Sequence, residues 1–401
     1  STLIQTPGLS IETIKALKAH SATLYFDGPA EALRVAEIAP RLGRLLPAPA
    51  QALGRWTLAN ALLFADRYEE AVALYDGARA DYLAMEQPLE AARMGVGQVW
   101  ALAYTGQFER ALELAGEIKP LLTTAAETNR ADQRRLGGLF NNLGITYDLL
   151  GQYEEALTAY DRKLHIAQVL DNRVDIARTH HNRACALTYL NAYDAALSAF
   201  QKAEAAFREA GLTADLARLA YNRGTLYAQW GQFAKAEEQF AEAQQQLSLL
   251  DDTDQARAAL TVYRALAQVE SGNALSSHLL DALTVAQKTL AEYGPPFEEG
   301  LACLALGRHY LAAGDLLSAQ QAFEQVLTIA DGGGGAPLTW EALHLLGNVS
   351  ERCGNPDGAL AYYRRAIEKI ETMRSDLYVE AFRAGFLAEK LNVFDGLTTR
   401  H

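Results

Sequence analysis

A short pattern returns at an almost constant distance along this chain of 401 residues. The segment "LLGQYEEALTAY" (149–160) is followed by "YLNAYDAALSAF" (189–200) and then by "QWGQFAKAEEQF" (229–240). A fixed period of about 40 residues predicts a solenoid, because one such unit cannot bury its apolar face unless a neighbour stacks on it. Aligned on the alanine of the pattern, the units are centred near Ala32, Ala71, Ala111, Ala156, Ala196, Ala236, Ser277, Ala319 and Ala359.

The residue spacing within a unit predicts two helices. Around Ala156, one aromatic residue lies three positions earlier (Tyr153) and another four positions later (Tyr160), so all three share one helical face. A second small residue, Gly144, lies twelve positions before the alanine, and the helix breaker Gly151 separates the two segments. We therefore expect helical hairpins whose two helices cross closely at the small residues.

The segment "NNLGITYDLLGQYEEALTAY" (141–160) resembles the tetratricopeptide repeat (TPR). That signature is a Leu-Gly pair, a tyrosine three residues later, a Gly-x-Tyr turn, then an alanine and an aromatic residue. The longer period is similar to that of the subgroup containing the Leu-Gly-Asn repeat proteins and kinesin light chains. The resemblance implies an all-α, right-handed α-solenoid of about nine TPR-like hairpins over residues 1–365, and a function in binding proteins or peptides.

Composition restricts the classes of partner and the compartment. The formal net charge of −13 disfavours nonspecific binding to nucleic acid, which needs a basic face, although it says nothing of a single groove. We find no apolar run long enough for a membrane span and no secretory signal, and we expect a cytoplasmic protein without membrane contact. The three cysteines are far apart and are expected to be free thiols.

Polar residues recur on the first helix of neighbouring hairpins, which lines the concave surface in the TPR family. Their offsets place them on one helical face, and arginine can hold a carboxylate at two points while asparagine can pair with a peptide backbone. This stripe predicts a groove for a protein or an extended, acidic peptide. The alternative is a solvated face on which the asparagines join neighbouring hairpins. The predicted groove residues are Arg93, Asn141, Asn142, Arg178, His181, Asn182, Arg218, Tyr221 and Asn222.

We expect no catalytic residues, no cofactor and no metal site in this chain. His181 and Cys185 lie four residues apart on one predicted helix, but no further ligand accompanies them and a catalytic dyad normally comes from separate elements. Arg183 and Arg223 stand where the neighbouring unit has Leu143, so each arginine needs a partner that the pattern does not reveal.

Residues 366–401 continue past the last hairpin as an amphipathic stretch. One interpretation is a capping helix for the terminal repeat. The segments "AIEKIETMRSDL", "RAGFLAEK" and "VFDGL" also resemble the linker that joins TPRs to a CHAT domain, a caspase-like cysteine protease domain of bacteria. The apolar positions of the stretch are Ile367, Ile370, Leu377, Phe382, Phe386, Leu387, Val393, Phe394 and Leu397.

The resemblance to that linker implies a sensor and scaffold that regulates an attached caspase-like protease. Two alternatives stay open. One is a stand-alone TPR adaptor or the ligand-sensing domain of a signalling ATPase or transcription regulator. The other is an enzyme, which the missing catalytic constellation disfavours.

Overall fold

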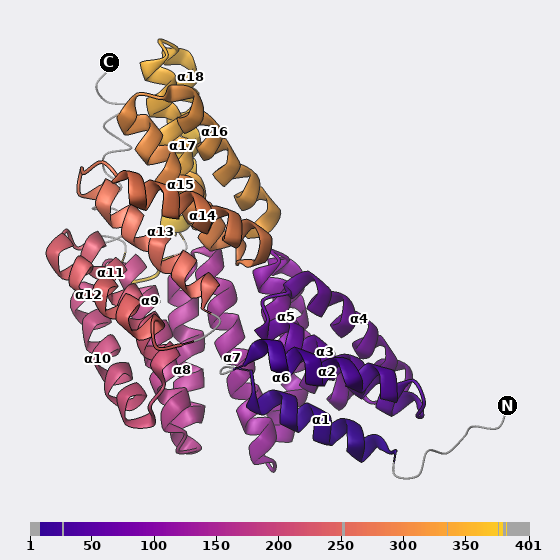
Figure 1. The fold of residues 1–401 in the computed structure, drawn as a ribbon. Helices are drawn as coiled ribbons and strands as arrows, with labels where there is room; N and C mark the ends of the chain where they lie inside the picture. The colour runs from indigo at the N-terminus through magenta and orange to yellow at the C-terminus, as the bar shows by residue number, and fades with distance from the viewer. Residues whose placement is uncertain are drawn as a thin grey trace. The chain divides into compact units, whose positions relative to one another are not determined.

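The computed structural model describes residues 9–25, 28–250, 253–334, 336–375, 377–379 and 382. Within these residues it contains 18 α-helices and no strand, and none of these helices is both long and apolar enough to cross a bilayer (Figure 1). The predicted all-α fold of stacked TPR-like hairpins is confirmed. The chain divides after Leu143, within α7, into two compact units, which we call unit 1 and unit 2 and describe separately.

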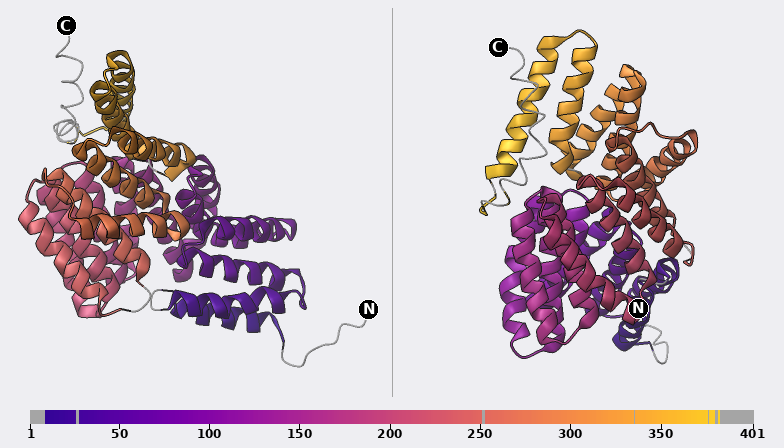
Figure 2. Two further views of the ribbon diagram at one scale, coloured as in Figure 1. Left: turned by 45° about the horizontal axis from the view of Figure 1, so that its top comes forward. Right: turned by 90° about the vertical axis from the view of Figure 1, so that its left-hand side faces the viewer.

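Consecutive helices pair into hairpins, seen as stacked layers in Figure 2. Unit 1 holds α1 to α6 and the start of α7, and unit 2 holds the rest of α7 and α8 to α18. The helices are α1 (Ile11–Thr23), α2 (Pro29–Gly43), α3 (Ala48–Phe64), α4 (Tyr68–Ala84), α5 (Pro88–Tyr104), α6 (Phe108–Ala126), α7 (Arg130–Leu150), α8 (Tyr153–Val169), α9 (Arg173–Tyr189), α10 (Tyr193–Ala210), α11 (Thr213–Gln229), α12 (Phe233–Leu247), α13 (Asp254–Glu270), α14 (Ser277–Tyr293), α15 (Pro296–Ala313), α16 (Leu316–Ile329), α17 (Ala336–Arg352) and α18 (Pro356–Ser375).

Small residues lie where the two helices of a hairpin cross, as the repeat pattern predicts. A Cβ atom at Gly224 of α11 would lie 2.5 Å from Cε1 of Phe240 on α12, closer than carbon atoms can approach. The same arrangement places Gly144 against the ring of Tyr160 within unit 2. The glycine and the aromatic ring are therefore complementary halves of one crossing.

The turns inside the hairpins use residues that tolerate left-handed backbone. Gly151, Gly231 and Gly314 have φ values of 77°, 74° and 83°, and Asn191 takes the equivalent place with φ 59°. Glycine has no Cβ penalty there, and asparagine is the side chain that best tolerates this region. Gly151, the breaker identified in the sequence, and its equivalents in the other hairpins therefore close these turns.

The hairpin of α13 and α14 departs from the predicted register. Ser277 is the exposed first residue of α14, whereas Ala236 and the other aligned alanines lie fourth in their helices and are buried. The buried residues Leu283, Ala286 and Leu290 of α14 have the spacing of Phe240, Ala243 and Leu247 of α12, so Leu279 is the equivalent of Ala236. The turn before α14 spans residues 271–276, longer than in the other hairpins, so alignment at a constant distance misplaces this unit by two residues.

In unit 2 the last hairpin packs against the helices that begin the unit. Tyr153 of α8 and Leu190, at the end of α9, share an apolar cluster with Leu343 of α17 and Ile370 of α18. Helix α18 continues to Ser375, so the predicted domain limit at residue 365 falls inside it. Leu377 and Phe382 join this cluster, while Phe386, Leu387, Val393, Phe394 and Leu397 lie outside the described residues.

Candidate functional site

Unit 2 contains a cavity of about 520 Å³ among α8, α9, α11, α12, α13, α15, α17 and α18. Its size is typical of ligand pockets, and its wall is rich in aromatic rings. These rings come from both helices of the hairpins: Tyr153 and Phe233 are the first residues of second helices, and the other rings lie on first helices. The aromatic residues in the wall are Tyr153, Tyr189, Phe233, Tyr263, Phe297 and Trp340.

Stacked rings join neighbouring hairpins around the cavity. Tyr153 of α8 stacks on Tyr189 of α9 with ring centroids 5.2 Å apart, and Tyr263 stacks on Tyr221 of α11 at 5.5 Å. Burial raises the pKa of the Tyr189 and Tyr263 hydroxyl groups. These tyrosines therefore stay neutral at physiological pH and present flat, amphipathic surfaces.

The charged residues of the cavity wall include an ion pair. Arg308 of α15 pairs with Glu341 of α17, and Glu270 of α13 also lines the cavity. Burial alone would lower the pKa of Arg308. The carboxylates of Glu341 and Glu270 outweigh burial, so the pKa of Arg308 lies above its usual value. Thr225 and Gln229 of α11 add neutral polar groups to the wall.

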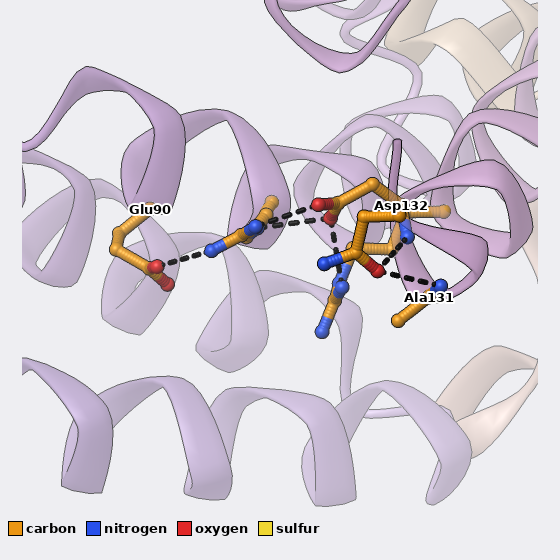
Figure 3. Close-up of polar contacts among 6 residues, drawn as sticks. Glu90, Ala131 and Asp132 are labelled. Atoms are coloured by element: carbon orange, nitrogen blue, oxygen red, sulfur yellow. Dashed lines mark hydrogen bonds and ion pairs between the residues drawn. The ribbon is translucent and has the colours of Figure 1, made fainter. Parts of the chain in front are cut away.

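Of the predicted groove residues, Arg93 belongs to an inter-repeat ionic cluster in unit 1. Arg93 of α5 holds Asp132 of α7 through two contacts, Nε to Oδ1 at 2.9 Å and Nη2 to Oδ2 at 2.6 Å. Arg135 donates to the same carboxylate at 2.8 Å, and Glu90 contacts the other side of Arg93 (Figure 3). Hydrogen bonds from Arg93 hold the pKa of the Asp132 carboxyl below its usual value.

The same cluster recurs in unit 2. Arg178 of α9 holds Asp215 of α11 with Nη2 to Oδ2 at 2.9 Å, and Arg218 donates to Oδ1 of Asp215 at 2.7 Å. Burial alone would raise the pKa of the Asp215 carboxyl, but the two arginines outweigh burial and lower it. In both units an arginine of one first helix therefore grips an aspartate of the next.

Most of the predicted amide and ring residues also contact neighbouring helices. Asn142 is 5% exposed and donates to the carbonyl oxygen of Val96 at 2.7 Å, and Asn141 donates to the Asn142 side-chain oxygen at 3.3 Å. In unit 2, Nδ2 of Asn222 lies 2.8 Å from Nε2 of the buried His181.

The cavity wall contains none of the nine predicted groove residues. Asn182 is half-buried on α9, and Tyr221 reaches the wall only through its stack on Tyr263. Whether the nine residues also contact a partner stays a prediction.

Sequence reasoning missed the aromatic residues at the ends of the first helices. A signal for them exists, because the aromatic residue that begins a second helix stacks on another about 36 residues later. Tyr68 stacks on Tyr104 in unit 1, and Tyr193 stacks on Trp230 in unit 2. Tyr153 and Tyr189 have the same spacing, so this second aromatic period would have identified Tyr189 as a residue of the cavity wall.

His181 and Cys185 lie in surroundings that keep both groups neutral. Burial, assisted by the Arg218 cation, lowers the pKa of His181 to about 3, and burial raises the pKa of the Cys185 thiol to about 12. A thiol with so high a pKa is a poor nucleophile. Among the described residues, no three histidine, cysteine or acidic side chains converge as metal ligands.

Arg183 and Arg223 have acidic partners. Nε of Arg183 lies 2.9 Å from Oδ1 of Asp161. Nη1 of Arg223 donates to Glu204 at 2.6 Å. The side chain of Arg223 is 11% exposed, so this arginine is a buried link between α11 and the second helices beside it.

Comparison with known proteins agrees with this architecture. One tetratricopeptide-repeat family model matches residues 136–209 and 300–371, and a second matches residues 217–245. No curated protein sequence matches the chain.

Several solved structures share the fold at low sequence identity. NprR in complex with its cognate peptide NprX is 14% identical, with 90% of this chain and 98% of that chain covered and a TM-score of 0.61. A Rap protein complexed with competence and sporulation factor is 15% identical, with 92% and 100% covered and a TM-score of 0.58. Aspartyl phosphate phosphatase F from Bacillus subtilis is 18% identical, with 83% and 88% covered and a TM-score of 0.56. Tetratricopeptide-repeat models thus match three segments of the chain, and the described residues share their fold with these solved structures.

Proposed function

We propose that the cavity of unit 2 binds part of an extended peptide and that the chain is a non-catalytic binding scaffold. The observation that carries this proposal is the 520 Å³ cavity itself, with aromatic rings from successive hairpins in its wall. Aromatic walls offer a large apolar contact area, and a few polar groups suffice to orient a ligand.

The solved structures with the same fold support a peptide as the ligand. NprR and the Rap regulator of plasmid pLS20 are both seen with bound peptides. Each covers at least 90% of this chain with a TM-score above 0.5.

The wall favours peptide side chains that are apolar or aromatic. Aromatic rings make up much of the wall, Thr225 and Gln229 add neutral polar groups, and the only cation among the described lining residues pairs with a carboxylate, Arg308 with Glu341. An acidic residue elsewhere in the partner could contact Arg178 and Arg218, a proposal supported by their repeated position on adjacent first helices.

The scaffold would act in the cytoplasm, and its output would be the regulation of an attached caspase-like protease. The resemblance of residues 366–401 to the linker before such a domain supports this output. The alternative is a stand-alone adaptor or a ligand-sensing domain of a signalling ATPase or transcription regulator. NprR from B. thuringiensis, described as a quorum sensor, has the same fold and supports this alternative.

The test is a peptide selection on the full chain followed by titration. A random peptide library is panned against the protein, and the selected peptides are titrated calorimetrically against wild type, Gln229→Trp and Lys235→Trp. Gln229 lines the cavity, so an indole there should fill it and weaken binding at least tenfold, whereas Lys235 is exposed on α12. Failure to select a peptide, or equal affinity for wild type and Gln229→Trp, would refute the proposal.

A further inference from the structure

Glu154 of α8 differs from the residues at the same position in other hairpins. It directly follows the aromatic residue that begins the second helix, as Glu69, Glu109 and Asp194 do in theirs. Those three side chains are exposed, whereas Glu154 is only 8% exposed. A carboxylate is rarely buried without compensating donors, so something specific must cover it.

The donors that compensate the burial of Glu154 are backbone amides that follow α18. Oε2 of Glu154 accepts from the amide of Tyr378 at 2.6 Å, and Oε1 accepts from the amide of Val379 at 2.8 Å. Both oxygens of one carboxylate thus bind two successive peptide groups that lie more than 220 residues away in the chain. Such charge-assisted hydrogen bonds are among the stronger contacts in proteins.

Apolar contacts flank this carboxylate clamp. Leu377 is 1% exposed and lies in the cluster of Tyr153, Leu190 and Ile370. Phe382 packs on the same cluster, and its amide donates to the carbonyl oxygen of Val379 at 3.0 Å. Residues 377–379 therefore lie on α8 as a bound peptide would. Leu377 is buried, and the amides of Tyr378 and Val379 donate to the carboxylate of Glu154.

This contact joins two parts of the cavity wall. Tyr153, the residue before Glu154, lines the cavity from α8, and Met373 lines it from the last turn of α18. The clamp therefore ties the end of α18 to the start of α8 where both border the cavity. Glu154 and residues 377–379 are not in the cavity wall, so the clamp would act on the cavity through the positions of Tyr153 and Met373.

We propose that residues 377–379 are a latch, bound by Glu154, whose release opens the cavity of unit 2 to its ligand. The latched form binds ligand weakly and the released form binds it well, so latch and ligand oppose each other. Because coupling between two sites is reciprocal, a bound peptide must release the latch by the factor by which the latch weakens the peptide. The ligand half of this inference rests on the proposed function, whereas the existence of the latch does not.

The test compares Glu154→Gln with Asp194→Asn in the full chain. Glutamine keeps the shape of Glu154 but loses its charge and one of its two acceptors, and Asp194 is the exposed residue at the equivalent position. Hydrogen exchange measured by mass spectrometry on the segment containing Tyr378 and Val379 should become at least tenfold faster in Glu154→Gln and stay unchanged in Asp194→Asn. Equal exchange in the two variants would overturn the latch.

Access to the cavity is measured separately with a thiol probe. Thr225→Cys places a thiol in the wall, and alkylation by iodoacetamide at this site is followed by mass spectrometry of the digested protein. Adding Glu154→Gln should speed alkylation about tenfold, whereas adding Asp194→Asn should not. Faster exchange of the latch without faster alkylation would show that the latch does not control the cavity.

Neither measurement uses a peptide. Hydrogen exchange and alkylation therefore test whether the latch exists and controls the cavity even if the proposed function is wrong. A selected peptide, if the panning yields one, should bind Glu154→Gln more tightly than wild type and should speed exchange of residues 378 and 379. Slower exchange on peptide binding would contradict the opposition of latch and ligand.

Discussion

His181 shows how a residue that suggests chemistry is used for packing. Its ring is buried, lies 5.8 Å from the ring of Phe200 between centroids, and contacts Asn222 of the next hairpin. The positive charge that a histidine could carry is excluded by burial and by the nearby Arg218. The ring therefore links two hairpins as a neutral group.

A neutral buried histidine makes stability depend on pH. The pKa of His181 is about 3 in the folded protein and about 6.5 when the ring is exposed, so between these values the unfolded chain binds more protons. The free energy of unfolding should therefore fall as pH drops below 6.5, by about 2 kcal/mol at pH 5. Urea unfolding at pH 7 and pH 5 should show this loss in wild type and a smaller one in His181→Gln.

The matched control for this prediction is the exposed His165 of α8. His165→Gln should keep the pH dependence of wild type. An equal pH dependence in His181→Gln and wild type would show that His181 is already charged in the folded protein.

At the scale of the hairpin, the glycine at each crossing is required by the ring that covers it. An alanine at Gly224 would place its Cβ 2.5 Å from a ring that is 1% exposed and cannot move aside. Overpacking of this kind costs about 1–3 kcal/mol, which exceeds the gain of about 1 kcal/mol that alanine brings to a helix. Gly224→Ala should therefore lower the midpoint of urea unfolding.

Gly116 of α6 is the control because no atom lies within 4 Å of a Cβ built there. Gly116→Ala should raise stability by up to about 1 kcal/mol through helix propensity alone. A stabilised Gly224→Ala would mean that the hairpins do not cross at this residue.

Between hairpins, the Arg178, Asp215 and Arg218 cluster should contribute measurably to stability. Asp215 is 6% exposed, so Asp215→Asn leaves two guanidinium groups around a neutral, largely buried amide. The expected loss is about 1–3 kcal/mol, since both arginines retain some contact with water. Glu209→Gln, which removes an exposed pair with Arg173, should leave unfolding nearly unchanged. Equal effects of the two variants in urea unfolding would contradict this role.

The hairpins could be predicted from the sequence because their determinants are local. Gly224 and Phe240 lie sixteen residues apart, and the turn glycine Gly231 sits between them, so one period contains the whole crossing. The long turn between α13 and α14 was not predicted, because its extra residues shift the register of α14 without changing the overall repeat period.

The candidate site could be predicted only in part. Arg178 and Arg218 were identified as a repeated pair, but their shared partner Asp215, three residues before Arg218 on α11, was not. The contact of Glu154 with Tyr378 depends on how far the stacked hairpins curve, which small rotations at every interface determine together.

At the scale of the whole molecule, the last hairpin of unit 2 packs against α8 beside the cavity. The wall therefore combines residues that are distant in sequence, such as Tyr153 of α8 and Met373 of α18. A ligand in such a cavity contacts several hairpins at once, so its binding should stabilise unit 2 as a whole.

The most direct measurement is photo-crosslinking of a selected peptide that carries a benzophenone in place of its central aromatic or apolar residue. After digestion, we expect crosslinks in the segments that contain the cavity residues Tyr189, Tyr263 and Trp340, and we expect their loss in Gln229→Trp. Crosslinks confined to the exposed faces of the second helices, or unchanged by Gln229→Trp, would contradict the claim that this cavity is the binding site.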